Sequence, residues 1–189
     1  MGAGRRGGLT GPSVLVRARE RSDVPVLQEL LYEDVRTRVR ADSRSWRPMA
    51  RDAAGSPYAV TEASDEVAMS SVVEAATGLL AGESLLWAVD AHNRGAHLGM
   101  ALLPHFRGRG LSHEVLDILK DYAFGILGLH RLQIETLCDN EAMLRTATRA
   151  GFVQEGVRRQ AAWVDGAFRD EAILGLLAGE RFPARPPQP

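Results

Sequence analysis

Several residue types are scarce in this chain of 189 residues, and each scarcity excludes a class of protein. The single cysteine, Cys138, excludes an intrachain disulfide, and together with five scattered histidines it gives no cysteine-rich zinc site. We therefore expect a reducing, cytoplasmic location and no bound metal. No apolar run approaches the roughly 18 residues of a membrane span, and Arg5-Arg6 is followed by glycines instead of an apolar signal segment. We expect no membrane partner.

An excess of charge of either sign is also missing, because the formal net charge is -1. Lysine is almost absent, with Lys120 the only one among 23 basic residues. A near-neutral chain gives no global reason to expect a nucleic-acid partner. A regulatory DNA or RNA binder using the arginine-rich stretch 36–51 is the alternative, but Asp34, Asp42 and Asp52 punctuate that stretch and favour a solvated helix.

The length and a hydrophobic content of 45% predict one globular domain. Residues 1–12 are rich in glycine and arginine, and residues 179–189 are rich in proline, so both segments are expected to be disordered. The folded domain is expected over 13–178.

Hydrophobic periodicity predicts alternating strands and helices inside that domain. The expected strands cover 14–18, 72–75, 79–89, 96–103, 132–137, 157–164 and 168–177. Helices are expected after Ser22 as the cap, over 115–122 and over 141–150. A further, more exposed helix is expected in the charged stretch with Val35 and Val39, ending before the loop around Trp46 and Pro48. Residues 61–71 lack periodicity and are expected to form a loop. An Asp165-Gly166 turn joins the last two strands.

The most informative segment is Leu102-Leu103-Pro104-His105-Phe106-Arg107-Gly108-Arg109-Gly110-Leu111-Ser112, between an apolar strand and an amphipathic helix. Glycines in such a turn let backbone amides converge on an anion at the positive end of the helix, and two arginines add charge. A plain strand-to-helix turn is the alternative. No Lys-Ser or Lys-Thr follows Gly110, and a third glycine is missing, so neither common nucleotide motif matches.

The segment resembles the pyrophosphate motif Q/R-x-x-G-x-G/A of GNAT acetyltransferases, with Arg107 and Gly110 in place and Ser112 at the last position. The resemblance extends over about Val14 to Leu177, and its tail is similar to the RimJ/RimL-like branch at Asn140, Gly151, Phe152, Gly156, Asp165-Gly166 and Asp170.

The resemblance implies an α+β GNAT fold, a mixed and mostly antiparallel sheet of about seven strands flanked by about four helices. Strands four and five of that fold splay apart and hold the pantetheine arm of acetyl-CoA, the implied cosubstrate. The residues that the family would use to bind it are Leu102, Leu103, Arg107, Gly108, Arg109, Gly110, Leu111, Ser112 and Asn140.

The family implies transfer of acetyl from acetyl-CoA directly to a primary amine, either a protein N-terminal α-amine or a small-molecule amine. The tyrosine and serine with which relatives protonate the leaving thiolate read Ala147 and Met143 here. A catalytically degenerate CoA-binding sensor or scaffold is therefore the alternative. The acceptor, the length of the acyl group and the oligomeric state, a homodimer included, stay open.

Two residues are candidates for the base that the reaction needs. His97 alternates out of phase with the buried residues of its strand, and histidine is the residue type that can exchange a proton near neutral pH. The alternative is a histidine that only caps the edge of a strand. Glu135 on the fifth strand is the second candidate, with a salt bridge to Arg131 or another arginine as the alternative. We expect Cys138 to be an ordinary thiol and not a covalent acetyl carrier. Trp46, Trp87 and Trp163 line the acceptor groove or pack in the core.

Overall fold

The computed structural model describes residues 7–42, 44–51 and 53–181. In chain order the elements are β1 (Leu9–Thr10), β2 (Val14–Ala18), α1 (Asp23–Leu27), the π-helix η1 (Gln28–Tyr32), α2 (Val35–Ala41), β3 (Ala68–Glu74), β4 (Leu80–Asp90), β5 (Gly95–Leu102), the 3₁₀ turn η2 (Pro104–Phe106), α3 (Leu111–Lys120), the π-helix η3 (Asp121–Ile126), β6 (Arg131–Leu137), α4 (Glu141–Arg149), β7 (Val153–Val164), β8 (Ala167–Leu177) and α5 (Ala178–Arg181).

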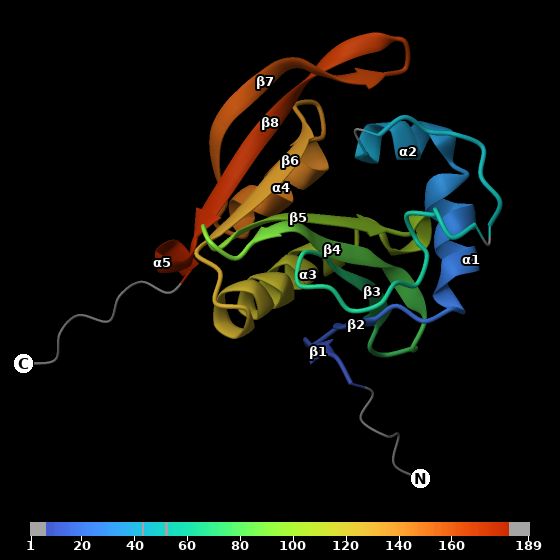
Figure 1. Cartoon of the computed structure of the whole chain (residues 1–189), viewed down its shortest axis with the longest axis horizontal. Helices are drawn as coiled ribbons and strands as arrows, with labels where there is room; N and C mark the ends of the chain where they lie inside the picture. Colours follow the sequence, from blue (N-terminus) through green and yellow to red (C-terminus); the bar gives the residue numbers. More distant parts are fainter. Residues whose placement is uncertain (1–6, 43, 52, 182–189) are drawn as a thin grey trace, which may run out of the picture.

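One eight-stranded sheet runs through the molecule in the order β1-β2-β3-β4-β5-β6-β8-β7. Every neighbouring pair is antiparallel except β5 and β6, which are parallel. Figure 1 shows β6 and the β7–β8 hairpin rising away from the half of the sheet that ends with β5. The predicted α+β class with a mixed, mostly antiparallel sheet is confirmed.

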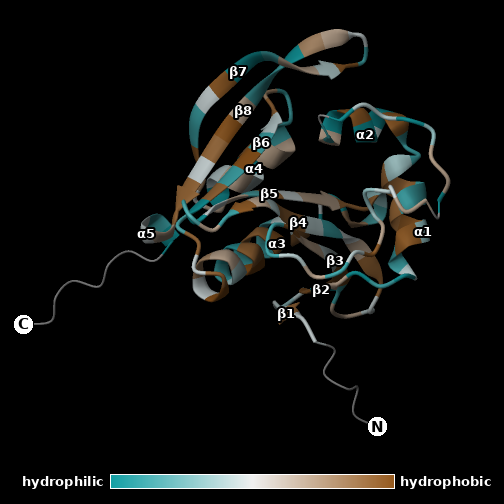
Figure 2. Cartoon of the chain, in the orientation of Figure 1, coloured by the Kyte–Doolittle hydropathy of each residue, from teal (hydrophilic) through white to brown (hydrophobic). Residues whose placement is uncertain are grey.

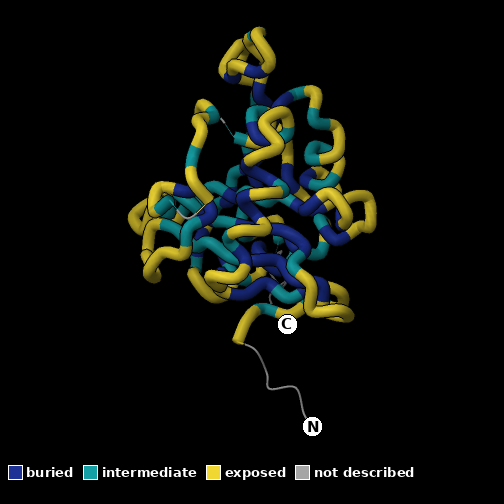
Figure 3. Tube along the Cα trace, turned by 90° about the vertical axis from the view of Figure 1, so that its right-hand side faces the viewer, coloured by how far each residue is buried: buried dark blue, intermediate teal, exposed yellow. Residues whose placement is uncertain are grey.

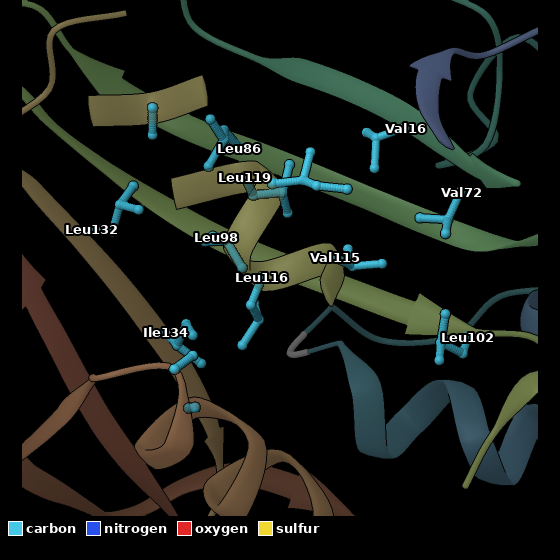
Figure 4. Close-up of a cluster of buried hydrophobic side chains, with 14 of the residues drawn as sticks. Val16, Val72, Leu86, Leu98, Leu102, Val115, Leu116, Leu119, Leu132 and Ile134 are labelled. Carbon is cyan, nitrogen blue, oxygen red and sulfur yellow. The ribbon is translucent and has the colours of Figure 1, made fainter. Parts of the chain in front are cut away.

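The core lies between the sheet and helix α3. Successive side chains of a strand point to opposite faces, and the face with Val16, Val72, Leu86 and Leu98 is buried. Helix α3 covers this face with residues at helical spacing, among them Leu116, which is fully buried. Figure 4 shows these leucine and valine side chains meeting between the α3 ribbon and the strands. The apolar contact fixes α3, and therefore its N-terminus, at the C-terminal end of β5.

The opposite face of the sheet carries polar and charged residues that anchor α1. The Arg17 guanidinium donates to both oxygens of Asp23, at 2.7 and 2.9 Å, and the Ser71 hydroxyl donates to Asp23 at 2.7 Å. Burial raises the pKa of Asp23, but the hydrogen bonds from Arg17, the Glu20 amide and Ser71 outweigh it and leave the pKa below its usual value. A second buried pair joins Arg19 to Glu83 at 2.6 Å. The Asp23 pair holds α1 against the sheet, and Arg19 also donates to the Pro57 carbonyl at 3.4 Å, which ties the segment after α2 to the sheet.

The β7–β8 hairpin projects from the domain. Brown and teal segments alternate along both strands in Figure 2, as expected for strands with one buried face. The hairpin tip at the top of Figure 3 is mostly exposed, and it carries Trp163 and Phe168 with ring centroids 4.9 Å apart. Leu137, Ala162 and Val164 form a small cluster with Val39 of α2, so the hairpin leans on α2.

Several details differ from the sequence prediction. Leu9–Thr10 pairs with β2, which moves the start of the ordered domain ahead of Ser13, while residues 1–6 and 182–189 of the predicted disordered ends lie outside the described residues. The predicted loop 61–71 ends earlier because β3 begins at Ala68, where pairing with β4 overrides the polar sequence. Helix α2, by contrast, ends at Ala41, before the loop around Trp46 and Pro48, as predicted. Ser22 precedes α1 without a side-chain cap hydrogen bond.

Candidate functional site

The loop between β5 and α3 has the geometry of an anion-binding turn. Gly108 and Gly110 have φ angles of +72° and +80°, a region that residues with a Cβ rarely adopt. A Cβ added at either glycine would meet no heavy atom within 4 Å, so the turn faces open space. Gly110 is the N-cap of α3, and the first amides of a helix have no intrahelical acceptor. The loop therefore presents free N–H donors and the positive end of the α3 dipole.

The two arginines of the loop have different surroundings. The Nε of Arg107 donates to the Leu102 carbonyl at 2.9 Å, which folds the side chain back over the end of β5. Arg109 pairs with Glu74 and lies over the Phe106 ring, 5.2 Å from its centroid. Hydrogen bonds from Thr77 and then Arg109 lower the pKa of Glu74. The charge of Arg109 is thus largely balanced by Glu74, while its backbone amide stays within the loop.

Strands β5 and β6 diverge, as the resemblance implies. Their parallel pairing joins Gly95, Ala96 and His97 to Arg131, Leu132 and Gln133, and it ends there. Strand β5 continues to Leu102 and β6 to Leu137, so beyond His97 and Gln133 the facing edges of the two strands are not paired with each other. We call the region between these two unpaired edges the opening. At about 3.3 Å per residue, the edge of β5 from His97 to Leu102 extends roughly 17 Å. Its far end meets the glycine loop.

His97 and Glu135, the two candidate bases, lie together where the strands part. The His97 Nδ1 is 3.8 Å from a Glu135 carboxylate oxygen, and their side chains are 31% and 22% exposed. Among the described residues this buried Nδ1 has no hydrogen-bond partner. The Trp87 ring lies beside His97 with centroids 5.4 Å apart. A partly exposed imidazole next to a carboxylate is an arrangement that can accept and return a proton.

Glu135 is also part of an ion-pair network. It accepts from Gln133 and from Arg158, both at 2.9 Å, and Arg158 also donates to Glu171 at 2.8 Å. The salt bridge proposed as the alternative reading therefore exists, with Arg158 as the partner, whereas Arg131 pairs with Glu155. Arg158 anchors Glu135 through Oε2, while Oε1, which accepts from Gln133, is the oxygen that lies 3.8 Å from His97.

The remaining predicted site residues lie on both sides of the opening, with Leu102 at the end of β5 and Asn140 at the start of α4. The Asn140 side chain caps α4, accepting from the Met143 amide at 3.3 Å and donating to the Thr136 hydroxyl at 2.9 Å. Ala147, at the position of the missing tyrosine, is fully buried. Leu102 and Leu103 are buried, and the Leu103 amide donates to Ala81 at 2.9 Å.

Cys138 has none of the neighbours that activate a thiol. Burial is the largest cause of a raised pKa at the Cys138 thiol, and the negative charges of Asp170, Asp139 and Glu171 raise this pKa further. A thiol that is harder to ionise is a poorer nucleophile at neutral pH, which agrees with the expectation of an ordinary cysteine.

The arginine-rich stretch is largely occupied by ion pairs. Arg38 and Arg44 both contact Asp42, Arg40 contacts Asp139 at 2.6 Å, and Arg51 contacts Glu33 at 2.8 Å. These arginines connect α2 and the following segment to the rest of the domain.

No group of three or more side chains suited to a metal ion occurs within the described ranges. No helix in those ranges is long and apolar enough to cross a membrane. A cavity of about 640 Å³ lies at the other end of β5 from the glycine loop, lined among others by Val67, Val89, Tyr122 and Leu129. Its lining residues do not include His97 or Glu135.

Comparison with known proteins agrees with this geometry. The acetyltransferase (GNAT) domain family matches residues 14–153. The putative ribosomal N-acetyltransferase YdaF of Bacillus subtilis is 33% identical over 103 residues, 54% of this chain and 56% of the relative. A spermidine N(1)-acetyltransferase of Vibrio cholerae is 26% identical over 106 residues, 56% of this chain and 61% of the relative. Such matches span about half the length of the curated relatives.

Solved structures share the fold. The crystal structure of the spermidine N-acetyltransferase from Vibrio cholerae, in complex with CoA and spermine, superposes with a TM-score of 0.81 and 20% identity, covering 90% of this chain and 98% of the other. A probable acetyltransferase superposes with a TM-score of 0.74 and 24% identity, covering 88% and 94%. With the glycine loop, the diverging strands and the matched family in agreement, the chain belongs to the GNAT acetyltransferase family and has its fold.

Proposed function

We propose that this protein is an acetyl-CoA-dependent N-acetyltransferase of the RimJ/RimL-like branch that acetylates a primary amine. The observation that carries the proposal is the joint placement of three features. The glycine loop lies at one end of β5, the strands part along its length, and the His97–Glu135 pair lies at the point of divergence. An anion site, an extended slot and a proton acceptor are what transfer from acetyl-CoA to an amine requires.

This placement supports the cofactor-binding residues that the family resemblance implies. The pyrophosphate would bind at the amides of Gly108 to Ser112, with charge from Arg107, and the pantetheine arm would lie along β5 near Leu102 and Leu103. The Leu102 carbonyl already accepts from Arg107 at 2.9 Å, but a carbonyl oxygen has two lone pairs and can accept a second bond. Asn140 borders the opening from β6. Arg109 would contribute its amide more than its charge, because Glu74 holds its guanidinium.

The reaction is direct transfer. The neutral amine nitrogen attacks the acetyl carbonyl carbon, and a backbone N–H on the unpaired edge of β5 stabilises the oxyanion. The carbon–sulfur bond then breaks and releases CoA as a thiolate. In this proposal His97, supported by Glu135, takes the proton from the amine.

The missing tyrosine and serine leave the thiolate without the usual acid. Thiols are weak acids, with an ordinary pKa of about 8.5 for the cysteine side chain, so a thiolate is a tolerable leaving group. The protonated imidazole of His97 can return the proton that it took from the amine. One residue would then serve as base and acid in turn.

The relatives supply the acceptor classes to be tested. One is named a spermidine acetyltransferase and another a putative ribosomal acetyltransferase. A polyamine-like small molecule and a protein N-terminal α-amine are therefore the two candidates for this chain.

Turnover with an amine panel tests the proposal. The purified chain is incubated with acetyl-CoA and either spermidine, butylamine or a short peptide with a free N-terminus, and free thiol and acetylated product are measured. An N-blocked, lysine-free peptide is the control. We expect amine-dependent thiol release with matching product. Binding of acetyl-CoA without thiol release would instead indicate a CoA sensor.

A further inference from the structure

The side chain of Trp87 lies on the same face of the sheet as His97 and Glu135. Strands β4 and β5 pair Trp87 with His97 and Leu85 with Gly99. A Cβ added to Gly99 would lie 3.0 Å from Cζ3 and 3.4 Å from Cη2 of Trp87, and 3.3 Å from Cδ2 of Leu85. The indole thus lies against the backbone of Gly99. That residue is in the part of β5 that has left β6.

A strained β-bulge fixes the position of Trp87. The register between β4 and β5 moves from Trp87–His97 to Asp90–Gly95, which leaves one extra residue in β4. Ala88, directly after Trp87, has a φ of +49°, in the left-handed region that residues other than glycine rarely adopt. Bulges next to functional sites re-aim side chains, and strain of this kind persists only where the surrounding structure imposes it. The bulge and the missing side chain at Gly99 together let the indole lie flat along β5.

The indole therefore occupies space beside the proposed path of the acetyl group and next to the proposed base. An amine that approaches His97 along this face passes the ring of Trp87, which is partly exposed. Methylene groups pack well on an aromatic face, and an ammonium group is attracted to it. A second carbon substituent on the carbon that bears the amine would point at the ring or at Leu85.

We propose that Trp87, accommodated by Gly99, selects acceptors whose amine is carried on an unbranched CH₂ carbon. This inference rests on the proposed function and narrows its substrate class. It favours the ends of polyamine-like molecules over the α-amine of a protein N-terminus, which is branched at its α-carbon in every residue except glycine. Glu135 and Glu171 share the single positive charge of Arg158, so this group keeps a net negative charge beside His97, near an incoming ammonium.

Two isomeric amines test the inference. Butylamine and sec-butylamine have the same composition and differ only in branching at the amine carbon. For the wild type we expect kcat/KM for butylamine to exceed that for sec-butylamine by roughly tenfold or more, the usual discrimination for one misplaced carbon. Trp87→Ala should reduce the ratio to about threefold or less, mainly by raising the sec-butylamine value, whereas Trp87→Phe should retain most of the discrimination. Phe168→Ala, which removes an aromatic ring that is 60% exposed at the hairpin tip, is the control and should leave the ratio unchanged.

Gly99→Ala adds a second, independent measurement. The new methyl group must displace the indole, so the ratio of kcat/KM for butylamine to that for sec-butylamine should change. In the Trp87→Ala background there is no indole to displace, so adding Gly99→Ala should leave the ratio of that variant unchanged. Thermal unfolding of each variant shows that it is folded.

The outcomes separate the two proposals. A wild type that acetylates neither these amines nor any other amine of the panel overturns the proposed function and this inference with it. A wild type that acetylates both isomers equally well, or a Trp87→Ala variant that is active with the wild-type ratio, overturns only the role of Trp87.

Discussion

Replacing Gly110 by aspartate tests the anion site of the glycine loop. The substitution places a carboxylate at the N-cap of α3, where the amides and the helix dipole favour an anion. No heavy atom lies within 4 Å of the added Cβ, so the side chain enters open space and the fold should survive. The backbone φ of +80° at Gly110 costs about 1–2 kcal/mol for most residues with a side chain, but Asn and Asp tolerate this left-handed conformation best.

The expected loss of binding follows from simple electrostatics. A unit charge about 5 Å from a phosphate charge, at an effective dielectric constant of about 20, costs roughly 3 kcal/mol, which weakens binding about 200-fold. At 100 times its wild-type Kd, acetyl-CoA stabilises the folded wild type by about 2.7 kcal/mol, or about 5–11 °C in Tm for a chain of this size. The aspartate variant at the same concentration should gain only about 0.2 kcal/mol.

Thermal unfolding with and without acetyl-CoA measures this difference. Gly110→Asn is the matched control, because it adds nearly the same volume in the same backbone conformation without a charge, and it should keep most of the stabilisation. ATP and NAD should stabilise the wild type far less, since neither has a pantetheine arm to pair with β5. If the aspartate variant is stabilised as strongly as the asparagine variant, the loop from Arg107 to Ser112 does not hold the pyrophosphate.

Three further predictions concern the base, the thiol and a buried carboxylate. His97→Ala should lower kcat/KM mainly below the pKa of the amine and leave acetyl-CoA affinity nearly unchanged, so an unchanged pH–rate profile would remove His97 from the mechanism. Cys138→Ala should keep most activity, and mass spectrometry should find no acetylated enzyme when acceptor is withheld; an acetyl group on Cys138 that amine discharges would reverse this. Asp23→Asn breaks the buried pair with Arg17 and should cost about 3–5 kcal/mol at pH 7. Because the folded-state pKa of Asp23 lies below its unfolded value of about 3.9, its contribution is present above that pH and is lost as the pH falls through the folded-state pKa. Urea unfolding at pH 7 and near pH 3 should therefore show that the difference in unfolding free energy between the wild type and Asp23→Asn becomes smaller in acid. Glu141→Gln, which removes the charge of an exposed pair, is the control and should change the unfolding free energy little at either pH. A difference for Asp23→Asn that does not become smaller in acid would exclude the Asp23 carboxylate as the source of the pH-dependent stability.

The fold was largely predictable because its elements are marked by strong local signals. The Asp165-Gly166 turn, the apolar spacing of α3 and the glycine after α4 all mark elements where the structure has them. Segments without a local signal were mispredicted. Strand β3 begins at Ala68 inside a polar stretch because its partners β2 and β4 hold it, and such long-range pairing leaves no periodicity in the sequence.

The site was predictable only in part, for reasons of register. Alternation along each strand indicated His97 and Glu135 separately, but the distance between them follows from the parallel pairing of β5 with β6. The ion pairs of Arg158 with Glu135 and Glu171 could not be predicted from the position of the hairpin turn. A regular hairpin with the register of the Trp163–Phe168 pair would place Arg158 opposite Ile173. The irregularity between Arg158 and Ala162, where Gln160 has a φ of +50°, shifts it to Glu171 instead.

The structure of the chain bound to CoA is the most direct measurement of the proposed function. We expect the pyrophosphate oxygens about 3 Å from the amides of the Gly108–Ser112 loop, the pantetheine arm along the unpaired edge of β5, and the thiol between β5 and β6 near His97. CoA bound elsewhere, for instance in the cavity lined by Val67, Val89 and Tyr122, or a thiol directed away from His97 and Glu135, would contradict the proposed function.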